Sequence, residues 1–164
     1  MVSWSTFHEL VPEFGTTVAA RCAARRHCTL ATLRPDGSPR LSGTELTLHD
    51  GELCIGIQAG AARIGDITHD ARTAVHVVGT DPDPAAANLW PGDVRIEGRA
   101  VQVPDAFRDA WCAAQSGLIP SEPFPMYRID IEGVVWVHLS EDGTELLVDS
   151  WRAGRSGIVR TTRT

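Results

Sequence analysis

The sequence predicts a mainly β protein with flanking helices, in which six or seven antiparallel strands form a single domain over residues 1–164. Two observations lead to this prediction. Short segments alternate apolar and polar residues with a period of two, and the turns between successive segments are too short for crossover helices. A chain of this length with 43% hydrophobic residues also has the size and core of one domain. A small closed barrel would leave no exposed sheet edge, whereas a doubly wound parallel sheet is disfavoured.

The first 27 residues are expected to be helical. Pro12 suits the first turn of a helix because its missing N–H is not needed there. After it, apolar residues recur at helical spacing, which predicts one buried face formed by Phe14, Val18, Ala19 and Cys22. The barrel is expected to follow over residues 28–152.

Residues 28–58 predict a β-meander of three strands. Turn residues separate these strands, because Pro35-Asp36-Gly37 and Asp50-Gly51 both favour tight reversals. The expected strands are 28–34, 39–50 with an interruption near Gly43, and 52–58.

Residues 59–70 predict a short helix in which Ile64 and Ile67 point inward, while Arg63 and Asp66 need not. A strand over 72–79 and an irregular proline-containing stretch over 81–93 come next.

The second half of the chain predicts three further strands and one helix. In the strand 93–103 the apolar parity changes around Gly98, which predicts a bulge or sharp bend. The remaining elements are expected as a helix over about 104–116, the longest strand over 126–140, a turn at Asp142-Gly143, a strand over 144–151 and a polar tail over 153–164.

The composition excludes several classes of function. A net charge of −6 argues against general nucleic-acid or anionic-membrane binding, which requires concentrated positive charge. All fifteen basic residues are Arg, so lysine-dependent chemistry is excluded. The four cysteines and six histidines lack metal-site spacings, and no metal is expected. Without a signal pattern or a long apolar run, we expect a cytoplasmic protein.

The segment 52–67 contains the clearest indication of a ligand site. A strand ends near Gln58, small residues follow over 59–62, and Arg63 lies in the next predicted helix. Small residues allow a ligand to approach backbone N–H groups, and an Arg can bind two phosphate oxygens at once. The alternative is that Arg63 is an ordinary surface residue of an amphipathic helix.

Four segments taken in order, 27–46, 50–78, 93–103 and 126–137, resemble the pyridoxamine 5'-phosphate oxidase-like split-barrel superfamily of flavin and deazaflavin proteins. The resemblance covers about residues 25–152. It implies a six-stranded antiparallel split barrel, which usually forms a homodimer with two cofactor sites at the subunit interface. The cofactor implied is FMN or, in one large branch, the 5-deazaflavin coenzyme.

The resemblance also implies roles for particular residues. Arg63 matches a basic residue that contacts the cofactor phosphate, and the segment with Gln58 and Ala59 leads into that phosphate site. The residues implied along the isoalloxazine ring are Ser42, Gly43, Thr44 and Glu45. Trp151 and Arg152 match a C-terminal strand that approaches the cofactor, sometimes from the partner subunit.

This sequence departs from the family in the segment 59–62, which is Ala-Gly-Ala-Ala where many FMN-binding members have a hydroxyl or second basic residue. The departure favours the deazaflavin coenzyme or a lost cofactor site. The leading hypothesis is a flavin- or deazaflavin-dependent oxidoreductase that acts on a small organic substrate by hydride transfer at the cofactor ring. A non-catalytic flavin- or haem-binding carrier or sensor, and an interaction domain with a vestigial pocket, remain open.

Overall fold

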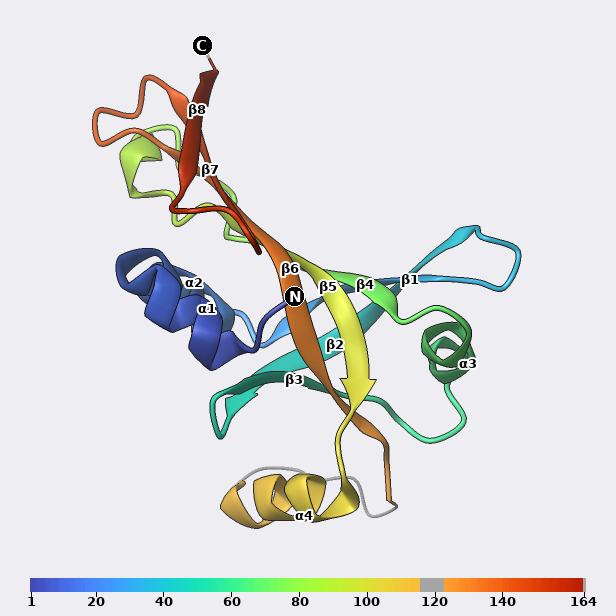
Figure 1. Ribbon diagram of the computed structural model, residues 1–164. Helices are drawn as coiled ribbons and strands as arrows, with labels where there is room; N and C mark the ends of the chain where they lie inside the picture. Colours follow the sequence, from blue (N-terminus) through green and yellow to red (C-terminus); the bar gives the residue numbers. More distant parts are fainter. Residues whose placement is uncertain (116–122, 164) are drawn as a thin grey trace.

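The computed structural model describes residues 1–115 and 123–163, which form an antiparallel barrel with helices around it (Figure 1). The helices are α1 (Trp4–Leu10), α2 (Pro12–Ala24), α3 (Ala62–His69), α4 (Asp105–Ala114) and a short 3-10 helix (Ala87–Leu89). The strands are β1 (His27–Leu33), β2 (Pro39–His49), β3 (Glu52–Gly56), β4 (Arg72–Val77), β5 (Asp93–Gln102), β6 (Met126–Leu139), β7 (Leu146–Arg152) and β8 (Val159–Arg163).

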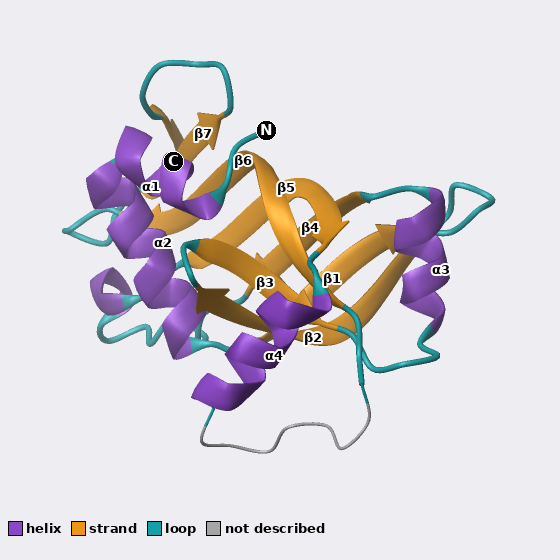
Figure 2. Cartoon of the chain, turned by 60° about the horizontal axis from the view of Figure 1, so that its bottom comes forward, coloured by secondary structure: helices purple, strands orange, loops and turns teal. Residues whose placement is uncertain are grey.

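Six strands close the barrel. They are hydrogen-bonded in the order β3-β2-β1-β4-β5-β6, and β6 pairs again with β3, so this ring has no free edge. All of these pairings are antiparallel. The predicted mainly β, antiparallel barrel is therefore confirmed, and Figure 2 shows the helices lying outside it.

Two more strands extend the sheet beyond the barrel. The first part of β6 pairs with β3, and residues 133–139 pair with β7, which in turn pairs with β8. Strand β8 lies within the stretch predicted only as a polar tail, so the chain has one strand more than expected. All five of its residues are exposed, and no apolar alternation marked it in the sequence.

The predicted turns are present. His49 pairs with Glu52 across a two-residue loop, and both loop residues have positive φ, 47° at Asp50 and 74° at Gly51. This is the turn that matches the twist of a hairpin. The register of β5 shifts between Glu97 and Gly98, which confirms the predicted bulge. The interruption predicted near Gly43 is wrong, because β2 runs unbroken through it and its pairing with β1 continues across the glycine.

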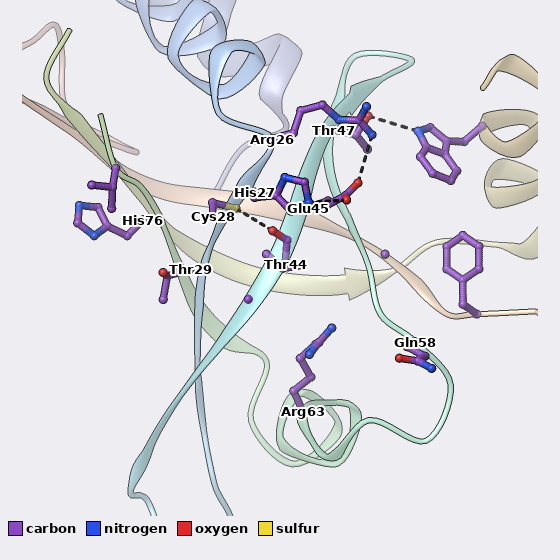
Figure 3. Close-up of a pocket in the computed structure, with 15 residues that line it drawn as sticks. Arg26, His27, Cys28, Thr29, Thr44, Glu45, Thr47, Gln58, Arg63 and His76 are labelled. Carbon is purple, nitrogen blue, oxygen red and sulfur yellow. Dashed lines mark hydrogen bonds and ion pairs between the residues drawn. The ribbon is translucent and has the colours of Figure 1, made fainter. Parts of the chain in front are cut away.

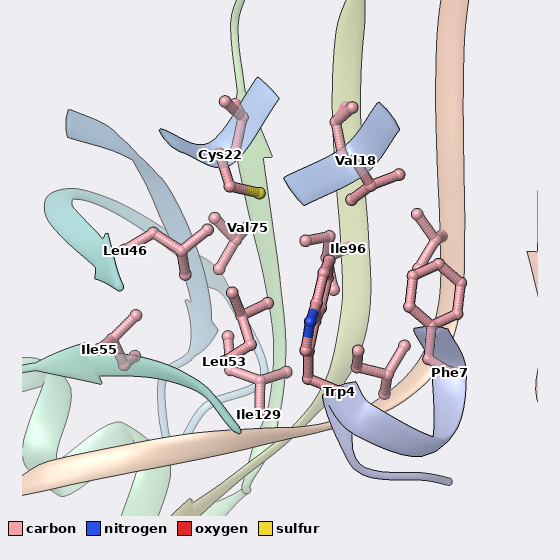
Figure 4. Close-up of a cluster of buried hydrophobic side chains, with 14 of the residues drawn as sticks. Trp4, Phe7, Val18, Cys22, Leu46, Leu53, Ile55, Val75, Ile96 and Ile129 are labelled. Atoms are coloured by element: carbon pink, nitrogen blue, oxygen red, sulfur yellow. The ribbon is translucent and has the colours of Figure 1, made fainter. Parts of the chain in front are cut away.

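The core lies between the barrel and the first two helices. Phe14, Val18 and Cys22 of α2 are buried as predicted, and α1 adds Trp4 and Phe7. Figure 4 shows Trp4, Phe7, Val18 and Cys22 against Leu46, Leu53, Val75 and Ile96 of the barrel. Burial of this apolar surface is the main favourable term holding α1 and α2 in place.

Helix α3 begins at Ala62 rather than near residue 59. Gln58–Ala61 instead form a turn, in which Ala61 N–H donates to the Gln58 carbonyl at 3.2 Å and Gly60 has a φ of 78°. The expectation that Asp66 need not point inward is also corrected, since Asp66 is 2% exposed. The described residues contain no helix that is long and apolar enough to cross a membrane.

Candidate functional site

A pocket of about 690 Å³ lies at the outer surface of β1 and β2, between α3 and α4. Its lining residues come from elements far apart in the sequence. They are Arg26, His27, Cys28, Thr29, Gly43, Thr44, Glu45, Thr47, Gly56, Gln58, Arg63, His76, Val78, Trp111 and Phe124. A volume of this size is typical of sites for drug-sized ligands and cofactors.

One end of the pocket is formed by Arg63 and Gln58 (Figure 3). Arg63 projects from the first turn of α3, and its Nε is buried without a hydrogen-bond partner among the described residues. The Thr44 hydroxyl oxygen is also buried without a hydrogen-bond partner among the described residues. Buried polar atoms are normally hydrogen-bonded, so these two groups point to a ligand or solvent partner.

The other end of the pocket is a cluster of charged side chains. Glu45 accepts a hydrogen bond from Arg26 Nη2 at 3.2 Å, and His27 Nε2 lies 2.9 Å from Glu45 Oε1. These side chains are all more than half exposed. Ion pairs in solvent contribute little to stability, so this cluster does more to set the polarity of the pocket than to hold the fold.

Aromatic and neutral side chains also line the pocket. The Trp111 indole N–H donates to Thr47 Oγ1 at 3.3 Å, and the Trp111 and Phe124 rings meet edge to face at 6.1 Å. Burial, followed by the charge of Glu45, raises the pKa of the Cys28 thiol to about 11. Cys28 is therefore a neutral wall residue at physiological pH and a poor nucleophile.

Five of the nine residues implicated by the sequence line this pocket, namely Gly43, Thr44, Glu45, Gln58 and Arg63. Ser42 and Ala59 lie next to lining residues in the chain but are not among them, and the Ser42 hydroxyl is buried without a partner among the described residues.

Trp151 and Arg152 do not line this pocket. Trp151 is 2% exposed and packs edge to face on Phe7 at 5.0 Å, while Arg152 donates to Glu97 at 3.0 Å. Both border a separate cleft of about 100 Å³. An approach of these two residues to a cofactor from the partner subunit stays a prediction.

Several lining residues were missed by the sequence analysis, including Arg26, His27 and Cys28 before and in β1, and His76 in β4. The signal that could have found them is strand register. The turn between β1 and β2 pairs Leu33 with Pro39, and counting back along both strands places His27 opposite Glu45. His76 pairs with Thr29, which only the tertiary arrangement reveals.

Solved structures share this fold. PhzG from Burkholderia lata, in complex with tetrahydrophenazine-1-carboxylic acid, aligns with a TM-score of 0.66 at 13% identity over 98% of this chain and 92% of its own. A pyridoxamine 5'-phosphate oxidase-related, FMN binding protein from Nostoc punctiforme aligns with a TM-score of 0.60 at 14% identity over 94% and 96% of the two chains. A heme binding protein from Mycobacterium smegmatis aligns with a TM-score of 0.53 at 25% identity over 89% of this chain, which spans 57% of the length of that protein.

No curated protein sequence matches the chain. The model of one protein family does match it, over residues 15–138, and that family is described as pyridoxamine 5'-phosphate oxidase. The matched segment is more than half of the chain and contains the barrel strands β1–β6 except Leu139, together with all of the residues that line the pocket. This chain belongs to the pyridoxamine 5'-phosphate oxidase family.

Proposed function

We propose that this protein binds FMN in the pocket between α3 and α4 and acts as an oxidoreductase on a small organic substrate. The observation that carries the proposal is Arg63, whose Nε is buried at one end of the pocket with no partner among the described residues. Family membership and the FMN-binding relative from Nostoc punctiforme support the same ligand.

The residues of the pocket fit such a coenzyme. Arg63 and Gln58 would hold the phosphate, since a guanidinium forms short charge-assisted hydrogen bonds to phosphate oxygens. Gly43 would let the ring approach β2 closely, because a Cβ added there would meet no atom within 4 Å. Thr44 would supply its hydroxyl, which has no hydrogen-bond partner among the described residues. A bound flavin supplies the hydride chemistry, and the protein supplies position and a partly dry surface.

The 5-deazaflavin coenzyme is the alternative ligand. Segment 59–62 offers no hydroxyl or basic side chain before Arg63, and Ala61 N–H is already used within the turn that precedes α3. Among the described lining residues, Arg63 and Gln58 are therefore the side-chain donors at the phosphate end of the pocket. A coenzyme that depends less on its phosphate for affinity, and more on contacts made by the rest of the coenzyme, would suit a phosphate site with so few side-chain donors.

We further propose that two copies of the chain form a homodimer with the coenzyme at their interface. The pocket shares Thr29 and His76 with a neighbouring cleft of about 340 Å³ on the outer face of the barrel. Apolar side chains of that cleft include Leu41, which is 72% exposed. A second copy covering this face would close the open side of the pocket.

The first experiment identifies the ligand. The protein is purified and denatured, the released small molecule is identified by mass, and FMN is then titrated into the ligand-free protein. Arg63→Ala should weaken FMN binding by about 1.5–3 kcal/mol, because a charge-assisted hydrogen bond is lost. Arg72→Ala, which removes an exposed Arg that pairs with Asp70 outside the pocket, is the matched control. Equal FMN affinities of the two variants would reject the proposed role of Arg63.

A haem-binding carrier or sensor is the second candidate. His27 and His76 both line the pocket, and imidazole is a common axial ligand of haem iron. The heme binding protein from Mycobacterium smegmatis supports this candidate. Titration with haemin should then give a shifted Soret band that His76→Ala or His27→Ala removes. Turnover of bound FMN by a nicotinamide would instead favour the oxidoreductase.

A further inference from the structure

Helix α3 carries a buried carboxylate one turn after the residue proposed to bind the phosphate. Asp66 is three residues after Arg63, one turn along the same helix. Only 3% of its side chain is exposed, although an acidic residue is rarely buried unless it is paired. An apolar residue at this position would pack the helix against the barrel at lower cost, so the carboxylate requires an explanation.

Asp66 is bound from two adjacent strands. Its Oδ2 accepts a hydrogen bond from Thr32 Oγ1 of β1 at 2.8 Å and another from Arg40 Nε of β2 at 2.6 Å. Thr32 and Arg40 are register partners across these strands, and Thr32 is itself 2% exposed. The Arg40 hydrogen bond is the main cause that lowers the pKa of Asp66, against the effect of burial, so the carboxylate is ionised.

This arrangement fixes the helix in a way that apolar packing does not. Apolar contacts are not directional, whereas two hydrogen bonds to one oxygen define both the rotation of α3 and its position along its axis. Within the described part of the chain, no side chain caps the N-terminal end of α3, where the N-cap residue is Ala61. Among the described residues, the hydrogen bonds of Asp66 to Thr32 and Arg40 tie this part of α3 to the barrel.

We infer that Asp66 is a positioning residue for coenzyme binding, and that with Thr32 and Arg40 it holds α3 so that the Arg63 guanidinium meets the phosphate. The inference rests on the proposed function of Arg63 and deepens it. The selectivity of the pocket for a phosphorylated ligand would then depend on the buried hydrogen bonds of Asp66 as well as on Arg63, which touches the ligand.

The test compares FMN with riboflavin, which has the same ring but no phosphate. The dissociation constants of both ligands are measured for wild type, Asp66→Asn, Arg63→Ala and the double variant. Asp66→Asn should reduce the preference for FMN over riboflavin by about tenfold, the scale of one charge-assisted hydrogen bond, while riboflavin affinity stays the same. The double variant should lose no more preference than Arg63→Ala alone, because both changes act on one contact.

Asp70→Asn is the matched control. Asp70 is the residue after the same helix, and it pairs with Arg72 at 2.6 Å, away from Thr32 and Arg40. This variant should keep the wild-type preference for FMN. If Asp66 has only a structural role, Asp66→Asn should weaken the binding of FMN and riboflavin equally. Equal weakening, or an unchanged preference for FMN in Asp66→Asn, would overturn the inference.

Two milder variants keep the test decisive if Asp66→Asn does not fold. Thr32→Val and Arg40→Gln each remove one donor to Asp66, and each should lower the FMN preference in part. If Arg63→Ala leaves FMN affinity unchanged, the proposed function of Arg63 fails and the inference fails with it. If Arg63→Ala abolishes the preference and the Asp66, Thr32 and Arg40 variants retain it, only the positioning role is wrong.

Discussion

At Gly43, the absence of a side chain is expected to matter for ligand binding and not for the stability of the fold. Gly43 lines the pocket, and a Cβ added there would meet no protein atom within 4 Å. Gly43→Val should therefore change the free energy of unfolding by no more than about 1 kcal/mol, the range of strand propensities. The added methyl groups should lower FMN affinity by about tenfold or more, because overlap with the ring costs roughly 1–3 kcal/mol. Unchanged affinity in a titration would mean that the ring does not lie over Gly43.

The stability of the protein is expected to depend on pH through two buried carboxylates, Asp66 and Asp149. The Arg40 hydrogen bond lowers the pKa of Asp66. Burial of Asp149 acts to raise its pKa, but hydrogen bonds from Arg160 and His138 outweigh it and leave that pKa lowered as well. A lowered pKa in the folded state stabilises the protein above the unfolded pKa of about 3.9, and this contribution is lost as the pH falls further.

The free energy of unfolding should therefore decrease as the pH falls below about 4, which chemical denaturation at a series of pH values can measure. Asp149→Asn should lower stability at neutral pH and flatten the acid dependence. Parallel curves for wild type and Asp149→Asn would show that Asp149 does not contribute to the acid dependence.

The bulge in β5 depends on a glycine, Gly98, at the point where the register shifts. A Cβ at Gly98 would lie 2.2 Å from the backbone oxygen of Asp130 in β6, and the β-ladder leaves that oxygen little freedom to move. Gly98→Ala should destabilise the protein by about 1–3 kcal/mol, as overpacking does. Gly65→Ala in α3 is the control, because its Cβ would meet nothing within 4 Å and Ala is the better helix former by about 1 kcal/mol. Equal unfolding midpoints would contradict the steric account.

Strand β8 is held by its partner and not by apolar burial. Arg160 donates two hydrogen bonds to the buried Asp149 of β7, both at 2.7 Å, and the backbones of the two strands pair over Val159–Arg163. His138 Nε2 lies 3.2 Å from the same carboxylate. A strand stabilised in this way leaves no hydrophobic pattern in the sequence.

For the whole molecule, the proposed dimer makes a prediction about assembly. Leu41→Asp places a charge on the outer barrel face and should shift the sedimentation of the protein from dimer to monomer. FMN affinity should fall with it, because the open side of the pocket would no longer be covered. Leu89→Asp is the control, since Leu89 is 75% exposed in the short 3-10 helix and lies outside that face. A wild-type monomer under the same conditions would reject the interface site.

The sequence alone determined the class of fold, its meander and its bulge, because strand periodicity, turn chemistry and glycine positions are local properties. It also singled out Arg63, since the change from strand to small residues to helix can be read along the chain. It could not reveal β8, whose exposed residues show no periodicity, or the buried position of Asp66, which depends on donors from two other strands.

Only the tertiary structure decided which residues share the pocket. Strand β1 pairs with both β2 and β4, and α3 and α4 contribute residues to the same cavity, so that Arg63, His76 and Trp111 line it from distant parts of the chain. The tertiary structure also placed Trp151 in the core of its own chain. These outcomes depend on long-range pairing and packing, for which a single sequence carries no periodic signal.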